Sequence, residues 1–458
     1  MLQSESLNRT FTSRAGFLFS AIGVAVGLGN LWRFPYIAGE NGGGAFVLIY
    51  ILCVFLIGVP IISGELILGK KGRGSAVLTM KRLIAEKSAS PLWKIIGWLS
   101  VAIPFFGLTY YSVVAGWSMD YVIQAAGNSF LGFDAARSNA AFDELAGDPG
   151  RSVFWQAIFI FITAVIVGKG VQGGIEKSIK IMMPILFILL ITLVGYAFVE
   201  ADFARGFYFL FNPDFSKVTG EIVLMAMGQA FFSIAVGVGA MITYSAYLKD
   251  DTSLGKYATV IAGADTLVAI LAALAIFPIV FASGLVTSEG PSLIFATLPI
   301  AFGSMPGGYL FGFLFFILIF FAALTSSICM LEPFVSYGEE KKGMSRPVVS
   351  GVIALGAFIV GIGATLSFNI WVDFYPLSFI PIFETRNIFG ILDYSIANLL
   401  IPVNGLLIAL FSGWILSKDD IRNYLGIENN SVFALWHFLL KIAAPIAVMA
   451  VLYSGVSG

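Results

Sequence analysis

The chain has 458 residues, of which 58% are hydrophobic and only 12% are charged, and its formal net charge is −1. An ordinary soluble domain carries about 25% charged residues, and no soluble protein of this length has an interior that could bury so much apolar surface. The composition therefore excludes a soluble globular protein, and the nearly neutral charge gives no reason to expect a nucleic-acid partner.

Apolar runs long enough to cross a bilayer recur along the whole chain. A helix needs about 20 mostly apolar residues to cross a hydrocarbon core of ~30 Å, and eleven segments meet this rule. Their centres lie near Gly27, Leu56, Tyr110, Phe161, Leu189, Ala235, Ala269, Phe320, Leu355, Leu406 and Ala444. The first begins near Gly16 without a small-residue cleavage site, so we expect a retained membrane helix. The sequence predicts an all-α membrane protein that forms one domain over residues 1–458.

The lysines and arginines predict how these spans are oriented. If the N-terminus is cytoplasmic, the segments on that side hold 19 of these residues and the opposite loops hold five. Lysine and arginine concentrate on the cytoplasmic side of membrane proteins. We therefore expect a cytoplasmic N-terminus and, after eleven spans, a C-terminus on the other side.

The first and sixth spans contain matching glycine-rich runs. Residues 25–30 read AVGLGN and residues 235–240 read AVGVGA, five spans apart. Because five is odd, the copies enter the membrane from opposite sides, which predicts inverted repeats over about residues 14–200 and 221–416, with an extra helix at about 434–454.

Glycine costs about 1 kcal/mol in a helix relative to alanine. Unwound backbone in a bilayer is tolerated only where it lines a cavity or meets ligands. Close helix packing is the alternative explanation, but it does not account for two matching runs at half-membrane depth. We therefore expect broken helices in both spans, with freed carbonyls that suit a cation and amides that suit a carboxylate.

Further motifs connect this pattern with a known family. The runs AVGLGNLWRFPY (25–36), NGGGAF (41–46), YYSVVAGW (110–117), GQAFFSIAVGVGAMITYSAY (228–247), GPSLIFATLP (290–299) and FAALTSS (321–327) closely resemble the neurotransmitter:sodium symporter family. The resemblance covers residues 14 to about 415 and implies a leucine-transporter-type fold that imports an amino acid with sodium. Eleven spans, fewer than most members have, resemble a bacterial subgroup of hydrophobic amino-acid carriers, which implies the inner (plasma) membrane.

The resemblance implies two sodium sites. Its first site takes the Ala25 carbonyl and the side chains of Asn30, Ser233 and Asp265, and its second takes the carbonyls of Gly23, Val26 and Ala322 with the hydroxyls of Thr325 and Ser326. Oxygen-only coordination suits a hard cation. Many members carry Asn where this chain has Asp265, and a carboxylate there would balance the sodium charge, so chloride is not expected. Asp265 could instead face a polar interhelical network, and Thr325 and Ser326 could bond to carbonyls one turn back.

The resemblance also implies a substrate pocket between spans 1, 3, 6 and 8. Its residues are Ala25, Gly27, Gly29, Gly107, Tyr111, Phe231, Phe232, Ala235, Val238, Ser326 and Met330. Amine carriers of the family place Asp at the position of Gly27, so here the substrate should bring its own carboxylate to the Gly27 and Gly29 amides and the Tyr111 hydroxyl. Gly107 leaves room for a bulky hydrophobic or aromatic side chain, although an apolar pocket discriminates one methylene by only about 1–3 kcal/mol.

Charged and aromatic residues predict gates on both sides of the pocket. By resemblance, the outer gate consists of Arg33 and Asp393 with Phe232 and Gln229, and the inner gate pairs Arg9 with Glu340 near Tyr247. Intramembrane charges are costly unless they are paired or hydrated, and for Glu65 in the second span we expect hydrogen bonds from the unwound backbone. Gly174 and Pro184 resemble a motif that lets span 5 unwind, with an ordinary helix start and a proline kink as the alternative.

Other function classes stay open at this point. A proton-coupled amino-acid carrier on the same scaffold would use Asp265 or Glu65, and a sodium-omission uptake assay distinguishes it. A sensor that binds an amino acid without moving it is also compatible with the sequence. A membrane enzyme is not expected, because His437 is the single histidine and Cys53 and Cys329 are the two cysteines. The oligomeric state and the exact amino acid are not predicted.

Overall fold

The computed structural model describes residues 10–248, 253–285 and 292–457, and within these ranges it contains helices but no β-strand. The α-helices are α2 (Arg14–Ala25), α3 (Phe34–Glu40), α4 (Gly44–Cys53), α5 (Val59–Gly72), α6 (Ala76–Glu86), α7 (Lys94–Ala126), α8 (Ala135–Gly147), α9 (Pro149–Gly168), α10 (Lys177–Glu200), α11 (Phe203–Phe211), α12 (Gly220–Ser233), α13 (Ala240–Ala246), α14 (Leu254–Ala282), α15 (Leu298–Ser304), α16 (Gly308–Lys342), α17 (Arg346–Leu366), α18 (Ile388–Tyr394), α19 (Ile401–Leu410), α20 (Lys418–Leu425), α21 (Asn430–Phe438) and α22 (Ala444–Ser457). The π-helical turns are η1 (Gly29–Arg33), η2 (Val54–Gly58), η4 (Val171–Glu176), η6 (Leu293–Thr297), η8 (Ser395–Leu400), η9 (Phe411–Ile415) and η10 (Leu439–Ala443), and the 3₁₀ turns are η3 (Pro91–Trp93), η5 (Phe215–Lys217) and η7 (Pro381–Phe383).

Nine of the predicted spans correspond to long apolar helical stretches, and a tenth does if a bent pair of helices is counted as one span. Nine continuous stretches of the described residues are long and apolar enough to cross a membrane: Gly44–Gly72, Pro91–Ala126, Pro149–Gly168, Val171–Glu200, Leu254–Ala282, Gly308–Lys341, Arg346–Leu366, Ile388–Ile415 and Asn430–Gly455. A tenth arises if Arg14–Ala25 and Gly29–Glu40, which meet at a bend of 51°, form one span. The predicted span around Ala235 consists of α12 with 14 residues and α13 with seven. Neither is long enough alone, so eleven spans stay a prediction.

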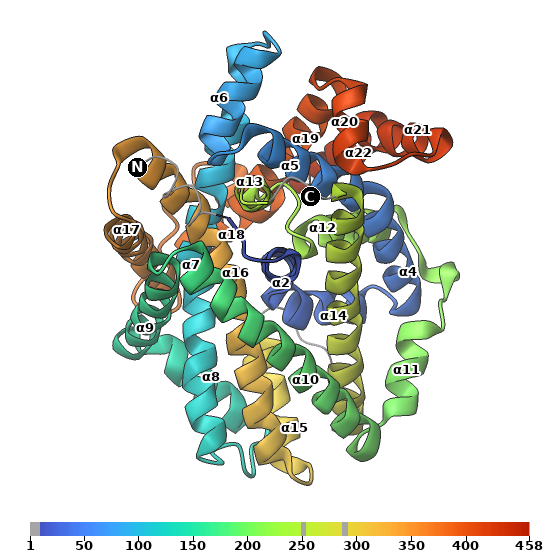
Figure 1. The fold of residues 1–458 in the computed structure, drawn as a ribbon. Coiled ribbons are helices and arrows are strands. Elements are labelled where there is room, and N and C mark those ends of the chain that lie inside the picture. Colours follow the sequence, from blue (N-terminus) through green and yellow to red (C-terminus); the bar gives the residue numbers. More distant parts are fainter. Residues whose placement is uncertain (1–9, 249–252, 286–291, 458) are drawn as a thin grey trace.

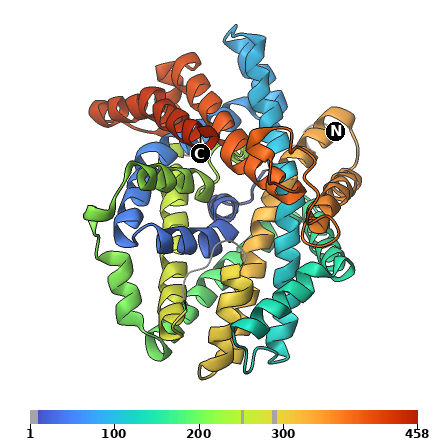
Figure 2. The same cartoon turned by 180° about the vertical axis from the view of Figure 1, so that it is seen from behind.

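The first half of span 1 lies in the middle of the bundle. Views from opposite sides show α2 enclosed by other helices, whereas α6, α11 and α21 lie at the periphery (Figures 1 and 2). The helices in contact with α2 include α10, α13, α14 and α16. Ser13 caps its start by accepting from the Gly16 amide at 3.0 Å, and the helix ends at Ala25 because Val26 adopts an extended backbone. The break that follows is therefore surrounded by protein and not by lipid, as unwound backbone requires.

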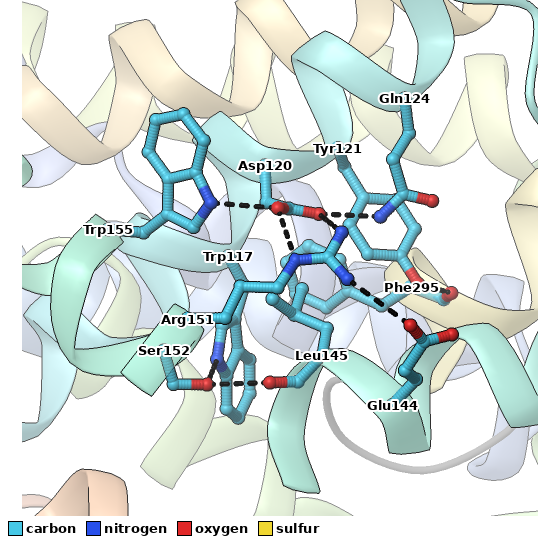
Figure 3. Close-up of polar contacts among 10 residues, drawn as sticks. All are labelled: Trp117, Asp120, Tyr121, Gln124, Glu144, Leu145, Arg151, Ser152, Trp155 and Phe295. Carbon is cyan, nitrogen blue, oxygen red and sulfur yellow. Dashed lines mark hydrogen bonds and ion pairs between the residues drawn. The ribbon is translucent and has the colours of Figure 1, made fainter. Parts of the chain in front are cut away.

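An ion pair between the partly exposed Arg151 and the buried Asp120 joins α9 to α7 (Figure 3). Arg151 donates from Nε and Nη2 to the two carboxylate oxygens of Asp120, at 2.8 Å each, and Trp155 Nε1 donates to the same carboxylate at 2.7 Å. Two parallel hydrogen bonds of this kind are strong and fix the geometry of both partners. At the next residue of α7, the Tyr121 hydroxyl donates to the carbonyl of Phe295 at 2.7 Å. These contacts hold α9 and the η6 segment against the same end of α7.

A cluster of opposite charges joins α20 to α5 and α6. The Asp420 carboxylate lies 2.8 Å from Lys87 Nζ and 3.4 Å from Lys71 Nζ. Its side chain is 27% exposed. The hydrogen bond from Lys87, with further contributions from Ser417 and Lys71, holds the pKa of Asp420 at about 2, below the ordinary value of about 3.9.

We expect this cluster to contribute a pH-dependent but small part of the stability. Because the folded-state pKa of Asp420 is depressed, its contribution is complete above about pH 4 and is lost as the pH falls toward about 2. Asp420→Asn should lower the free energy of unfolding at pH 7 by about 0.2–1 kcal/mol, as for other partly exposed ion pairs. Thermal unfolding in detergent across this pH range measures the difference, and a difference that grows on acidification would contradict the assignment.

Candidate functional site

Span 1 is interrupted where the glycine run predicts it. Between α2 and η1, the Gly27 amide donates to Asn30 Oδ1 at 3.0 Å, and the Leu28 amide donates to the Tyr111 hydroxyl at 3.4 Å. A Cβ on Gly27 would lie 2.5 Å from Ser326 Oγ and 3.2 Å from the Tyr111 hydroxyl. A larger residue at position 27 would therefore have to displace Ser326, at the point where spans 1, 3 and 8 meet.

Span 6 is interrupted between α12 and α13. Ala235, Gly237 and Gly239 have φ values of +54°, +83° and +80°, a region that glycine adopts readily and alanine rarely. The Gly237 amide donates to Glu65 Oε1 at 2.7 Å, and Asn404 Nδ2 donates to the Gly237 carbonyl at 2.8 Å. The prediction that Glu65 accepts from the unwound backbone is confirmed at span 6. Asn404 was not predicted.

The side chains predicted for the first cation site converge on Asp265. Asn30 Nδ2 donates to Asp265 Oδ1 and Ser233 Oγ donates to Asp265 Oδ2, both at 2.7 Å. The Tyr50 hydroxyl lies 3.0 Å from Ser233 Oγ and 3.3 Å from Asp265 Oδ2, and sequence reasoning missed it. All four side chains are buried. Ala25, the remaining member, ends α2 just before the break.

The residues predicted for the second cation site also meet. Ser326 Oγ donates to the carbonyl oxygens of Val26 and Gly23, at 3.1 and 3.3 Å. Thr325 Oγ1 donates to the Ala322 carbonyl in its own helix at 3.0 Å. The alternative of bonding one turn back therefore applies to Thr325, whereas Ser326 contacts span 1. The result is a buried group of oxygen atoms contributed by α2, its break and α16.

A cavity of about 210 Å³ opens beside the span 1 break. Its lining residues are Leu28, Gly29, Trp32, Arg33, Tyr36, Tyr110, Tyr111, Val114, Phe232, Phe389 and Asp393. The predicted pocket residues Gly29, Tyr111 and Phe232 are among them, and the ring of Phe232 would lie 3.0 Å from a Cβ on Gly29. The other predicted pocket residues do not line this cavity. They are Ala25, Gly27, Gly107, Phe231, Ala235, Val238, Ser326 and Met330.

Three of the four residues predicted for the outer gate, Arg33, Phe232 and Asp393, line the same cavity. The Arg33 guanidinium lies 4.1 Å from the centre of the Phe232 ring. In the described part of the chain, Arg33 forms no ion pair with Asp393, although both line the cavity. Gln229 Nε2 donates to the Gly29 carbonyl at 3.4 Å, so it contacts the start of η1 and not the charged pair that it was predicted to support.

The predicted inner gate is only partly described. Arg9 lies outside the described residues, so its pairing with Glu340 stays a prediction. Glu340 Oε2 accepts from the Ser75 amide at 2.9 Å. Tyr247, Glu340 and Arg346 line a second cavity of about 850 Å³.

A buried charged group beside this second cavity was missed by the sequence reasoning. The Tyr247 hydroxyl donates to Glu332 Oε1 at 2.7 Å, and Arg346 Nη2 donates to Glu332 Oε2. Arg346 also bonds to the Val167 carbonyl at 2.9 Å and pairs with Glu339 at 3.1 Å. Glu332 is fully buried. Its position inside an apolar span was the available signal, because an intramembrane carboxylate requires a partner.

Comparison with known proteins gives consistent matches over nearly the whole chain. The Sodium:neurotransmitter symporter family matches residues 8–132 and 146–457. The uncharacterized sodium-dependent transporter YhdH of Bacillus subtilis (strain 168) is 38% identical over 454 residues, 98% of each chain. An uncharacterized sodium-dependent transporter of Haemophilus influenzae is 33% identical over 464 residues, 99% of each chain. The crystal structure of MhsT in complex with L-phenylalanine is similar with a TM-score of 0.88 and 38% identity, covering 98% of this chain and 99% of MhsT.

Proposed function

Because the chain belongs to the Sodium:neurotransmitter symporter family, we propose that it imports hydrophobic L-amino acids, bulky or aromatic ones above all, by alternating access. Family membership makes it a sodium-dependent symporter and not an enzyme. Its fold is the all-helical, leucine-transporter-type fold of a multi-pass membrane transporter. The proposal adds the substrate class, the ion sites and the gates.

The observation that carries the substrate class is the close packing at Gly27. A Cβ at this position would lie 2.5 Å from Ser326 Oγ, so a larger residue would have to displace Ser326, and glycine itself offers no carboxylate to a substrate amine. A substrate with its own carboxylate complements the break, where the Leu28 amide and the Tyr111 hydroxyl lie together. At Gly107 an added Cβ would meet only Met330 Sδ, at 3.9 Å, so no branched side chain narrows the break from this side. The phenylalanine bound to MhsT supports an aromatic substrate.

Sodium would travel as cargo through two sites. The first would use the Ala25 carbonyl with Asn30, Ser233 and Asp265, and the second would use Gly23, Val26, Ala322, Thr325 and Ser326. Oxygen ligands from carbonyl, hydroxyl, amide and carboxylate groups suit a hard monovalent cation. Asp265 supplies a negative charge beside the first site, so transport would not require chloride. Binding of sodium and of the substrate carboxylate would then strengthen each other reciprocally.

Alternating access would open the two cavities in turn. The outer gate would consist of Arg33, Asp393, Phe232 and Gln229, and the inner gate of Arg9, Glu340 and Tyr247. We place the N-terminus in the cytoplasm and the chain in a bacterial plasma membrane. One domain over residues 1–458 would comprise inverted repeats at about 14–200 and 221–416 and an extra helix at about 434–454.

Uptake by proteoliposomes tests the proposal. Moving one charge through 100 mV provides about 2.3 kcal/mol, and a tenfold gradient provides about 1.4 kcal/mol per ion. Two sodium ions could therefore concentrate a zwitterion about 10⁵-fold. We expect labelled phenylalanine to accumulate only with an inward sodium gradient, to be displaced best by large hydrophobic amino acids among all twenty, and to accumulate equally when gluconate replaces chloride.

Each alternative has a different result in this assay. A proton-coupled carrier would accumulate phenylalanine under a pH gradient without sodium. A sensor would bind the amino acid without accumulating it. Uptake that disappears on chloride removal would contradict the role proposed for Asp265 while leaving sodium coupling intact.

A further inference from the structure

A buried carboxylate outside both cation sites connects the start of α2 to span 5. Glu176 at the end of η4 accepts from the Thr12 amide at 2.7 Å and from the Thr12 hydroxyl at 2.5 Å, and Lys180 Nζ lies 2.6 Å from the same carboxylate. The Glu176 side chain is 2% exposed, and a Cβ on Gly16 would lie 1.9 Å from its Oε1. Thr12 precedes the N-cap residue Ser13, whose hydroxyl also lies 3.4 Å from Glu176 Oε1, and negative charge is favourable beside a helix N-terminus. Glu176 therefore stabilises the start of α2 from a different span.

The same face of span 5 continues to the second cation site. Ile179 and Met183 follow Glu176 by three and seven residues, a spacing that places side chains on one side of a helix. A Cβ on Gly23 would lie 3.8 Å from atoms of both Ile179 and Met183. The carbonyl of Gly23 accepts from Ser326. Span 5 thus holds α2 at its first turn through Glu176 and supports it again at Gly23, so a shift of α2 along span 5 would displace the carbonyls of the site.

Glu176 lies in a segment where the regular α-helical pattern is absent. The connection from α9 passes through Gly170 with φ +92°, and η4 is a π-helical turn that ends at Glu176. Such turns frequently occur at functional sites. A Cβ on Gly174 would lie 1.9 Å from the Ile166 carbonyl. Rearrangement of this turn would withdraw the carboxylate from Thr12.

We propose that Glu176 is a positioning residue for the transport cycle. Its contacts with Thr12 hold the first half of span 1 against span 5 while the second cation site is formed, and they must break before α2 can move away from the core. This inference rests on the proposed function for its place in the cycle, whereas the contact itself is a property of the fold.

The chain carries its own reporter for movement of α2. Cys329 Sγ in α16 lies 3.9 Å from the carbonyl of Ser20 in α2, and Cys329 is 1% exposed. Displacement of α2 would uncover this thiol. Because the chain contains only one other cysteine, Cys53, a Cys53→Ala background makes alkylation specific for Cys329.

The test measures alkylation of Cys329 by N-ethylmaleimide in the purified full-length protein, by mass spectrometry, in choline and in increasing sodium. A hydrogen bond to a charged group is worth roughly a tenfold change in an equilibrium. We expect Glu176→Ala to accelerate labelling in choline about tenfold or more, and to raise by a similar factor the sodium concentration that slows labelling. Thr12→Ala should act in the same direction but less strongly. Glu200→Ala, at the exposed opposite end of α10, should label like the parent.

Labelling rates and sodium curves that match the parent in both Glu176→Ala and Thr12→Ala would overturn the proposal. If Glu176→Ala does not fold, Thr12→Ala decides the question, because Thr12 is exposed and the variant removes little more than a hydroxyl. The comparison in choline involves no sodium. Failure of sodium to slow labelling in the parent would therefore contradict the proposed ion site and not the role of Glu176.

Discussion

Asp265→Asn is expected to raise the sodium concentration for half-maximal transport at least about a hundredfold. The wild-type carboxylate is buried and lies within 2.7 Å of both Asn30 and Ser233, two residues of the proposed first cation site. A full charge about 4 Å from a cation contributes on the order of 4 kcal/mol at an effective dielectric constant of 20. Asparagine keeps the shape and removes the charge, so the loss should appear in sodium affinity.

The measurement is the sodium dependence of phenylalanine uptake, repeated with chloride and with gluconate. Asp143→Asn, which neutralises an exposed carboxylate in α8, should leave the sodium curve unchanged. If Asp265 provides the charge that balances sodium, chloride should partly restore uptake in Asp265→Asn. An unchanged sodium curve would favour the alternative in which Asp265 only stabilises a polar network with Tyr50, Asn30 and Ser233.

The broken helices could be predicted because glycine reports directly on the backbone. Gly27 and Gly29 predict the end of α2, and Gly237 and Gly239 predict the interval between α12 and α13. Ala235 at φ +54° could not be predicted in the same way, since alanine disfavours this conformation. Hydropathy also detects the length of an apolar run but not its continuity. The run around Ala235 was therefore predicted as one span with a break, and the structure has two short helices there, neither long enough alone to cross a membrane.

The site was predictable where one motif contains several of its members. FAALTSS places Thr325 and Ser326 one turn after Ala322, so their common location follows from the helix period. Tyr50 and Asn404 were missed because a single polar residue in an apolar span carries no local pattern. Tyr50 contacts Asp265 across 215 residues of sequence. Only tertiary structure brings such partners together.

Arg346→Met should destabilise the protein strongly, because it leaves the fully buried Glu332 without a positive partner. In the parent, Arg346 donates to Glu332 and to the Val167 carbonyl, and the Tyr247 hydroxyl donates to the other Glu332 oxygen. Removing one partner of a buried ion pair typically costs about 3–5 kcal/mol. We therefore expect a loss of this size in the free energy of unfolding, observed as a lower Tm in detergent.

The double variant Glu332→Gln/Arg346→Met distinguishes charge from packing. Replacing both members of a buried ion pair with neutral residues of similar size is often nearly neutral, so the double variant should recover most of the lost stability. Arg137→Met removes an arginine that lies over the Phe133 ring at an exposed position, and it should change Tm little. If the double variant is as unstable as Arg346→Met, the loss comes from the bond to Val167 and from packing. The charge of Glu332 would then not explain why spans 6, 8 and 9 meet at this point.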